Sequence, residues 1–239
     1  MIIFLSVIGV FGALNKGLVS VLPHILGSVI VCVVIDGVFE FVKTKRFVFS
    51  QSAVISGLII GEVLEPGNLF LVLFVSFAAT VSKHFINFDK GHVFNPASFG
   101  LLLAMFFFTN TSSWWGGSLI GWQWYVMAAF GIFIAYKMKN LPLLAAFFIS
   151  HSVVAGLYAF STGQPILGYV FSVNLYFMFF MLVEPMTSPK KLTGKIVYGI
   201  LVAILGFLVI FILPQYDHYV TALVIVDLFV PVINRIFVK

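Results

Sequence analysis

The chain has 239 residues, of which 62% are hydrophobic and only 9% are charged, and its mean hydropathy is +1.15. A soluble domain carries roughly 25% charged residues, so this composition excludes a water-soluble protein and predicts one whose solvent is lipid. The net charge of +5 is not concentrated in any long basic cluster, which argues against nucleic-acid binding, and the single cysteine excludes an internal disulfide or a cysteine-ligated metal site.

The apolar segments predict ten membrane crossings, since a spanning helix needs about 20 mostly apolar residues. The start, MIIFLSVIGVFGAL, lacks a basic n-region and a clear cleavage site, so it is predicted to be a first span and not a signal peptide. Two of the segments are short and are candidates for half-helices that protein shields from lipid. Divided at charges and at Gly, Pro, Asn and Ser clusters, the segments are 1–15, 18–42, 52–65 (short), 69–86, 94–109 (short), 119–136, 141–161, 166–185, 194–213 and 217–236.

The distribution of basic residues predicts the orientation. If the N-terminus is cytoplasmic and every segment crosses, twelve of the thirteen Lys and Arg residues fall inside, and only Lys16 lies outside. Cytoplasmic loops carry an excess of Lys and Arg, so the sequence predicts a multi-pass protein of the cytoplasmic membrane with both termini inside. Trp114, Trp115, Trp122 and Trp124, near the outer surface, are typical of an interfacial aromatic belt.

An internal repeat with an offset of 119 residues divides the chain into two halves. VLEP at 63–66 recurs as LVEP at 182–185, and Leu-Pro and Gly matches occur at the same offset. Each half, 1–118 and 119–239, holds five predicted crossings, an odd number, so the halves have opposite orientations. The prediction is an all-α, single membrane domain of two inverted five-segment repeats, whose broken helices meet near the midplane and form the site there.

Four acidic residues predict an ion pathway. Glu65 and Glu184 each precede a proline, which ends or kinks a helix; the alternative is that both lie in the headgroup zone as helix ends. Glu62 and Asp227 lie inside the apolar stretches LIIGEVL and LVIVDLFV, so they are predicted to be buried. An acid within a membrane commonly serves an ion or proton pathway; the alternative is a local hydrogen bond to a polar neighbour.

The stretch FNPAS predicts a helix that begins at a fixed place. Asn95 is a good N-cap, and Pro96 suits the first helical turn. The free N–H groups of that turn favour an anion, and Lys83, His84 and His92 precede it. The stretch therefore predicts a site for a phosphate, a carboxylate or a reduced flavin ring; the alternative is a plain helix start near the cytoplasmic surface.

Four stretches carry a resemblance to a known family: ISGLIIGEVLEP, SKHFINFDKGHVFNPASFGLLL, FMFFMLVEPMTSPKKLTGKIVYGILVAIL and VTALVIVDLFVPVINRI. Their order and spacing resemble the NqrB/RnfD family, membrane subunits of the sodium-pumping NADH:quinone oxidoreductase and of the Rnf electron-transport complex. The resemblance covers about residues 18–237, and the FNPA and E-P-x-T-S-P steps are its most specific parts. It implies ten helices in two inverted halves, similar to urea transporters, with flavin (FMN or riboflavin) binding and transmembrane electron transfer coupled to Na⁺ or H⁺ movement.

The region after the NPA helix departs from that family. Members with covalent FMN attach it through a Thr in an S/T-G-A-T type motif there. The corresponding stretch, TNTSSWWGGSLIG, offers the hydroxyls of Thr109, Thr111, Ser112 and Ser113 without the motif. The prediction is therefore a flavin that is bound noncovalently.

Two functions stay open. The first is an electron-transfer subunit of a membrane oxidoreductase, which would serve other electron-transport subunits or extracytosolic flavoproteins. The second is a transporter or channel for a small solute or a flavin on the same scaffold. The retained N-P-A and T-S-P steps favour the first, and the missing attachment motif favours the second. In the first, Asn95, Thr187 and Ser188 would line the flavin, with Lys83 and His84 nearby.

Overall fold

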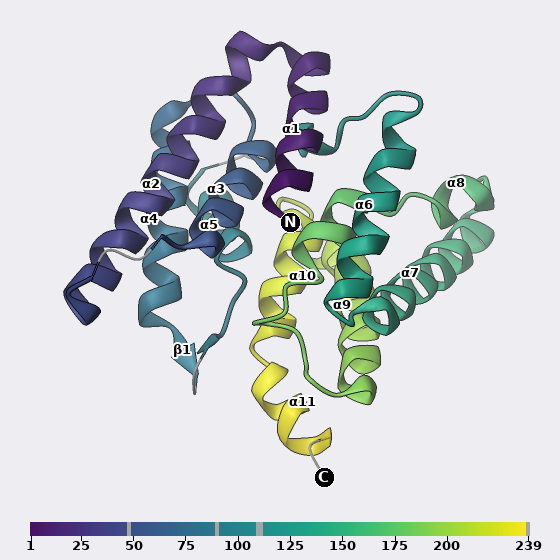
Figure 1. Cartoon of the computed structure of the whole chain (residues 1–239). Helices are drawn as coiled ribbons and strands as arrows, with labels where there is room; N and C mark the ends of the chain where they lie inside the picture. The colour runs from purple at the N-terminus through teal and green to yellow at the C-terminus, as the bar shows by residue number, and fades with distance from the viewer. Residues whose placement is uncertain (47–48, 89–90, 109–111, 238–239) are drawn as a thin grey trace.

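The structure, a computed structural model, describes residues 1–46, 49–88, 91–108 and 112–237 (Figure 1). Within these ranges it is all-α apart from an isolated β-bridge between Leu64 and Ser112 and one antiparallel pair of two-residue strands, the hairpin β1 (Asn87–Phe88) and β2 (Gly91–His92). In Figure 1 the turn between the first two helices lies at the top, and β1 and the C-terminal helix lie at the bottom. The prediction of an all-α fold is confirmed.

The first half of the chain contains five helices. Side-chain caps fix where three of them begin: the Ser50, Asn68 and Asn95 side chains accept hydrogen bonds from the backbone N–H three residues later. Asn95 as N-cap, with Pro96 in the first turn, is as the sequence predicts. The helices are α1 (Ile2–Lys16), α2 (Leu18–Thr44), α3 (Gln51–Val63), α4 (Leu69–Phe85) and α5 (Pro96–Phe107).

The second half follows a similar order, with shorter pieces between its long helices. Its N-cap Asp217 accepts hydrogen bonds from the N–H groups of Tyr219 and Val220. The first half ends with η1 (Trp115–Gly117), and the elements of the second half are α6 (Gln123–Lys137), α7 (Leu141–Thr162), α8 (Ile166–Val170), η2 (Phe177–Met181, a turn of π-helix), α9 (Leu192–Ile212), α10 (His218–Asp227) and α11 (Val230–Phe237).

Not every predicted segment is one continuous helix. The segment 166–185 is split into α8 and η2, because the side chains of Ser172 and Asn174 bond to the backbone at Tyr169 and Phe177 and compete with helical hydrogen bonds. The segment 217–236 is split into α10 and α11, bent by 51°. By length and composition α2, α7 and α9 can each cross a membrane, α10 and α11 can do so together, and α1, α3, α4 and α5 are shorter apolar helices.

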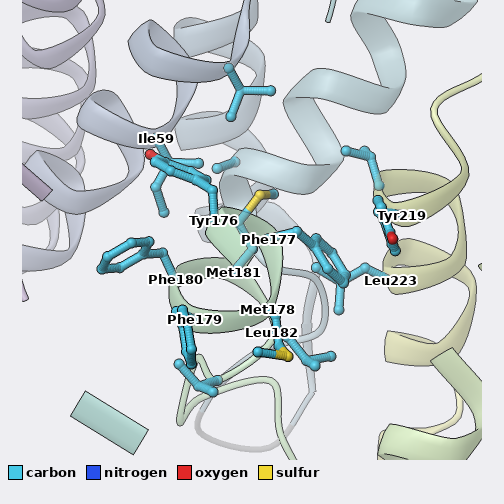
Figure 2. Packing of buried hydrophobic residues seen from close by; sticks show 14 of the residues in the cluster. Ile59, Tyr176, Phe177, Met178, Phe179, Phe180, Met181, Leu182, Tyr219 and Leu223 are labelled. Atoms are coloured by element: carbon cyan, nitrogen blue, oxygen red, sulfur yellow. The ribbon is translucent and has the colours of Figure 1, made fainter. Parts of the chain in front are cut away.

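The centre of the molecule is η2, whose side chains point outward on all sides (Figure 2). Tyr176, just before η2, reaches Glu62 of α3, while Phe177 faces α10 and stacks on Tyr219 with ring centroids 4.9 Å apart. The residues of η2 are buried. One hydrophobic core therefore joins the two halves of the chain.

Candidate functional site

Contacts between distant segments gather the basic connections at one end of the molecule, which we name the basic end. Lys195 of α9 donates to the carbonyl of Lys139, between α6 and α7, at 2.7 Å. The Arg235 guanidinium of α11 lies 5.5 Å from the ring centre of Phe88 in the hairpin. Lys43 Nζ at the end of α2 lies 3.1 Å from His84 Nδ1 at the end of α4, and α11 packs on α9, so the connections after α2, α4 and α6 and before α9 lie toward the same end.

The opposite end, which we name the tryptophan end, is built from the α1–α2 turn and residues 112–124. Lys16 pairs there with Glu65 at 3.3 Å, and both side chains are more than 40% exposed. Glu65 therefore lies at an exposed helix end. Trp122 and Trp124 are exposed, as an aromatic belt requires, but Trp115 is 1% exposed and packs inside the protein.

A cavity of about 950 Å³ lies at the basic end, between the hairpin, residues 185–190 and α11. Its volume is at the upper end of the range for ligand and cofactor pockets. Lining polar groups come from three separate segments, so the chain must fold before they meet. They are His92, Thr187, Lys190, Asn234 and Arg235.

A smaller cavity of about 230 Å³ adjoins the first, and Pro185 and Met186 line both. The N-terminal half of α3 forms one of its walls, and Asn95 and Glu184 contribute polar groups. This cavity lies between the halves, with α3 from the first half and Phe180 from the second.

Asn95 links three elements at the start of α5 and is 3% exposed. Its Oδ1 accepts from Ser98 N, and its Nδ2 donates to the carbonyl of Met181 at 3.3 Å. Its backbone N–H donates to Asp227 Oδ2 at 3.0 Å. A carboxylate of the protein itself therefore occupies the start of α5, the place where the sequence predicts an external anion.

Thr187 lies in a polar cluster behind the larger cavity. Its hydroxyl donates to Glu184 Oε2 at 3.5 Å, and His92 Nε2 lies 3.2 Å from Glu184 Oε1. Ser188 is buried and its Oγ accepts from Asn140 Nδ2 at 3.3 Å. Of the predicted cofactor residues, Thr187 lines the larger cavity and Asn95 lines the smaller one. Ser188 lines neither, and its bond to Asn140 supports residues 185–190, the segment that borders both cavities.

Lys83 and His84 lie elsewhere, where α2 packs on α4. Lys83 Nζ and His84 Nε2 lie 2.8 and 2.7 Å from Asp36 Oδ1. Neither residue lines either of the two cavities. Asp36 is fully buried and is not among the predicted site residues. Asp36 lies in the apolar stretch VVIDGVF, so the signal that marks Glu62, an acid inside an apolar stretch, could also have identified Asp36.

Two buried carboxylates each accept a hydrogen bond from a tyrosine. Glu62 Oε2 accepts from Tyr176 at 2.7 Å, and Asp227 Oδ1 accepts from Tyr198 at 2.6 Å. Both acids are 0% exposed, so their predicted burial is confirmed. The tyrosines are not predicted, because the Glu62–Tyr176 bond joins residues 114 positions apart.

The hydroxyl-rich stretch after α5 packs against α10. Thr109 and Thr111 lie outside the described residues. Ser112 Oγ and Trp114 Nε1 both donate to Asp217 Oδ2, at 3.3 and 2.6 Å. These two groups therefore hold the start of α10.

Comparison with known proteins identifies one family. A search of the curated proteins finds no match. The profile of the NQR2, RnfD, RnfE family matches residues 114–239, more than half of the chain, including Thr187, Ser188 and the α10–α11 segment. The chain therefore belongs to the NQR2, RnfD, RnfE family.

Proposed function

We propose that the chain is a membrane-embedded electron-transfer subunit that holds a flavin noncovalently at its basic end and passes electrons across the bilayer. The observation that carries this proposal is the 950 Å³ cavity, two walls of which, residues 185–190 and α11, lie within the family match. Its partners would be other electron-transport subunits or extracytosolic flavoproteins.

The lining of the larger cavity suits an anionic, aromatic cofactor. Lys190 and Arg235 would hold a phosphate or an anionic ring, because cationic donors form short, strong hydrogen bonds with such oxygens. Phe88 offers an aromatic face, and Thr187 offers a hydroxyl. A bound flavin would supply the capacity to accept and release electrons. The chain's own residues bind it, orient it and shield it from water.

The inverted repeat forms part of the same proposal, and the order of helices supports it. In each half a helix of 15 residues precedes a long helix, then a short buried piece, a helix of at least 17 residues and a short capped helix; the second half adds α8 and α11. The two capped helices, α5 and α10, run antiparallel: Asn95 meets Asp227 at one end, and Ser112 meets Asp217 at the other. Ten crossings in two inverted halves, 1–118 and 119–239, account for this arrangement.

A spectrum and an intact mass test the proposed cofactor. Protein purified in mild detergent is expected to show flavin absorption while its mass stays unmodified. The double variant Lys190→Gln/Arg235→Gln should lose the absorption, because it removes both the ammonium and the guanidinium group from the cavity lining. The matched control Lys191→Gln/Arg46→Gln makes the same charge change outside that lining and should keep it.

Two results would contradict the proposal. A mass increase of one FMN would show covalent attachment. A wild-type protein without flavin absorption would remove the redox function.

A transporter is the second candidate, favoured by the adjoining cavities on either side of Pro185 and Met186. On the same inverted scaffold, a solute would pass between the two halves. Colourless protein that moves riboflavin or another small solute into liposomes would establish this function in place of electron transfer.

A further inference from the structure

We infer that Glu62 is a proton-binding site, and that the ion it exchanges is H⁺ and not a metal cation. A role for this proton in coupling electron transfer to ion movement rests on the proposed function. Proton binding itself can be tested without a flavin. The site lies where α1, α3 and η1 meet the start of η2, toward the tryptophan end.

The other three predicted ion-pathway acids have partners for both oxygens or are exposed. Glu65 is exposed and pairs with Lys16. Asp227 accepts a hydrogen bond on each oxygen. Glu184 has one partner on each of its oxygens as well.

Glu62 differs because half of its carboxyl group has no partner. Oε2 accepts the Tyr176 hydrogen bond, whereas Oε1 is buried without a hydrogen-bond partner in the described part of the chain. None of the ion pairs among the described residues includes Glu62. A buried ionised carboxylate with no cation beside it costs on the order of several kcal/mol, and the Tyr176 hydrogen bond satisfies only one of its two oxygens. The group must therefore bind a positive ion.

The walls around Glu62 decide which ion fits. A Cβ atom at Gly9 of α1 would overlap Oε1, and one at Gly116 of η1 would lie 2.6 Å from Glu62 Cβ. The carboxyl group thus fills the space left by two absent side chains. A metal cation needs a shell of several oxygen ligands in place of its hydration water. No group of three or more His, Cys, Asp or Glu side chains among the described residues gathers at a possible metal site. A proton needs no such shell.

Contacts of the neighbouring residues place Glu62 between the two ends of the molecule. The carbonyl of Gly61 accepts from Trp115 Nε1 at 3.0 Å, and the carbonyl of Val63 accepts from Ser113 N at 2.8 Å. Both donors belong to the connection that forms the tryptophan end. On the other side, Tyr176 contacts Phe180, which lines the smaller cavity, with ring centroids 5.2 Å apart. Glu62 therefore lies between the tryptophan end and the cavities of the basic end.

Infrared difference spectroscopy on reconstituted protein tests the inference. The wild-type spectrum minus that of Glu62→Gln should contain the C=O stretch of a protonated carboxyl group. This band should shift when H₂O is replaced by D₂O, and it should be the same in NaCl and KCl. Tyr176→Phe should move it to higher frequency, because a hydrogen bond to the carboxyl group is lost. In Asp227→Asn, the matched variant of the other tyrosine-bonded acid, the Glu62 band should remain.

Three outcomes would overturn the inference. They are the lack of such a band, a band that does not respond to D₂O, and a band that Na⁺ but not K⁺ removes, which would assign a sodium site. Thermal unfolding of each variant in detergent shows whether it is folded. Flavin absorption is recorded on the same samples, so a failure of the proposed cofactor is seen separately from a failure of the proton site.

Discussion

Single residues that lack a side chain shape the Glu62 site as much as those that carry one. Gly9 and Gly116 lie on either side of Glu62, and a Cβ at either would overlap or crowd it. Protein interiors are close-packed, so the space around Glu62 leaves no room for an added methyl group. The sequence predicts that Glu62 is buried, but it does not indicate which glycines make room for it.

Gly9→Ala is expected to destabilise the protein, because the added methyl group collides with Glu62 Oε1. Overpacking of this kind costs about 1–3 kcal/mol, which should appear as a lower Tm in detergent. The control is Gly37→Ala in α2, where an added Cβ meets nothing within 4 Å; there the lower backbone entropy of alanine should leave the Tm equal or higher. Combining Gly9→Ala with Glu62→Ala should cost less than the sum of the two changes; additive losses would show that the two residues do not touch.

At the scale of elements, local signals predicted most helix boundaries, and long-range contacts explain the exceptions. The predicted segments at 18–42, 69–86 and 141–161 match α2, α4 and α7 within two residues at each end, because caps and charges lie next to the chain they bound. The break inside 166–185 was not predicted, because the side-chain bonds of Ser172 and Asn174 oppose the apolar pattern. For the candidate site, burial of acids was predicted, whereas the Asp36 cluster and the tyrosine partners depend on contacts between distant segments.

Asn95→Ala should destabilise the protein more than Asn68→Ala. Both residues cap a helix, and removal of a cap costs about 1 kcal/mol. The Asn95 side chain additionally donates to the carbonyl of Met181 in a buried position. Within the described residues, the Asn68 side chain accepts a hydrogen bond but donates none. Thermal unfolding and the retention of flavin absorption measure the difference. Equal losses would show that the Asn95–Met181 bond contributes nothing beyond the cap.

At the scale of the whole molecule, the contacts that gather the basic connections at one end support the inverted arrangement. Single cysteines in place of Lys45, Lys191 and Lys16, in a Cys32→Ala background, test it with a membrane-impermeant thiol reagent. Positions 45 and 191 should react from the same side of the membrane, because an even number of predicted crossings separates them. Position 16 should react from the opposite side, because an odd number separates it from each of the other two. Labelling of positions 45 and 191 from opposite sides would contradict the two inverted halves and with them the proposed ion pathway.

The bond between Asn95 and Asp227 has a consequence for biosynthesis. The ribosome adds Asp227 132 residues after Asn95, which at 5–20 residues per second takes on the order of ten seconds. During that interval the first turn of α5 lacks the carboxylate that later accepts its N–H, and an unsatisfied backbone group in lipid costs several kcal/mol. The start of α5 is therefore completed only after one of the last helices of the chain has been made.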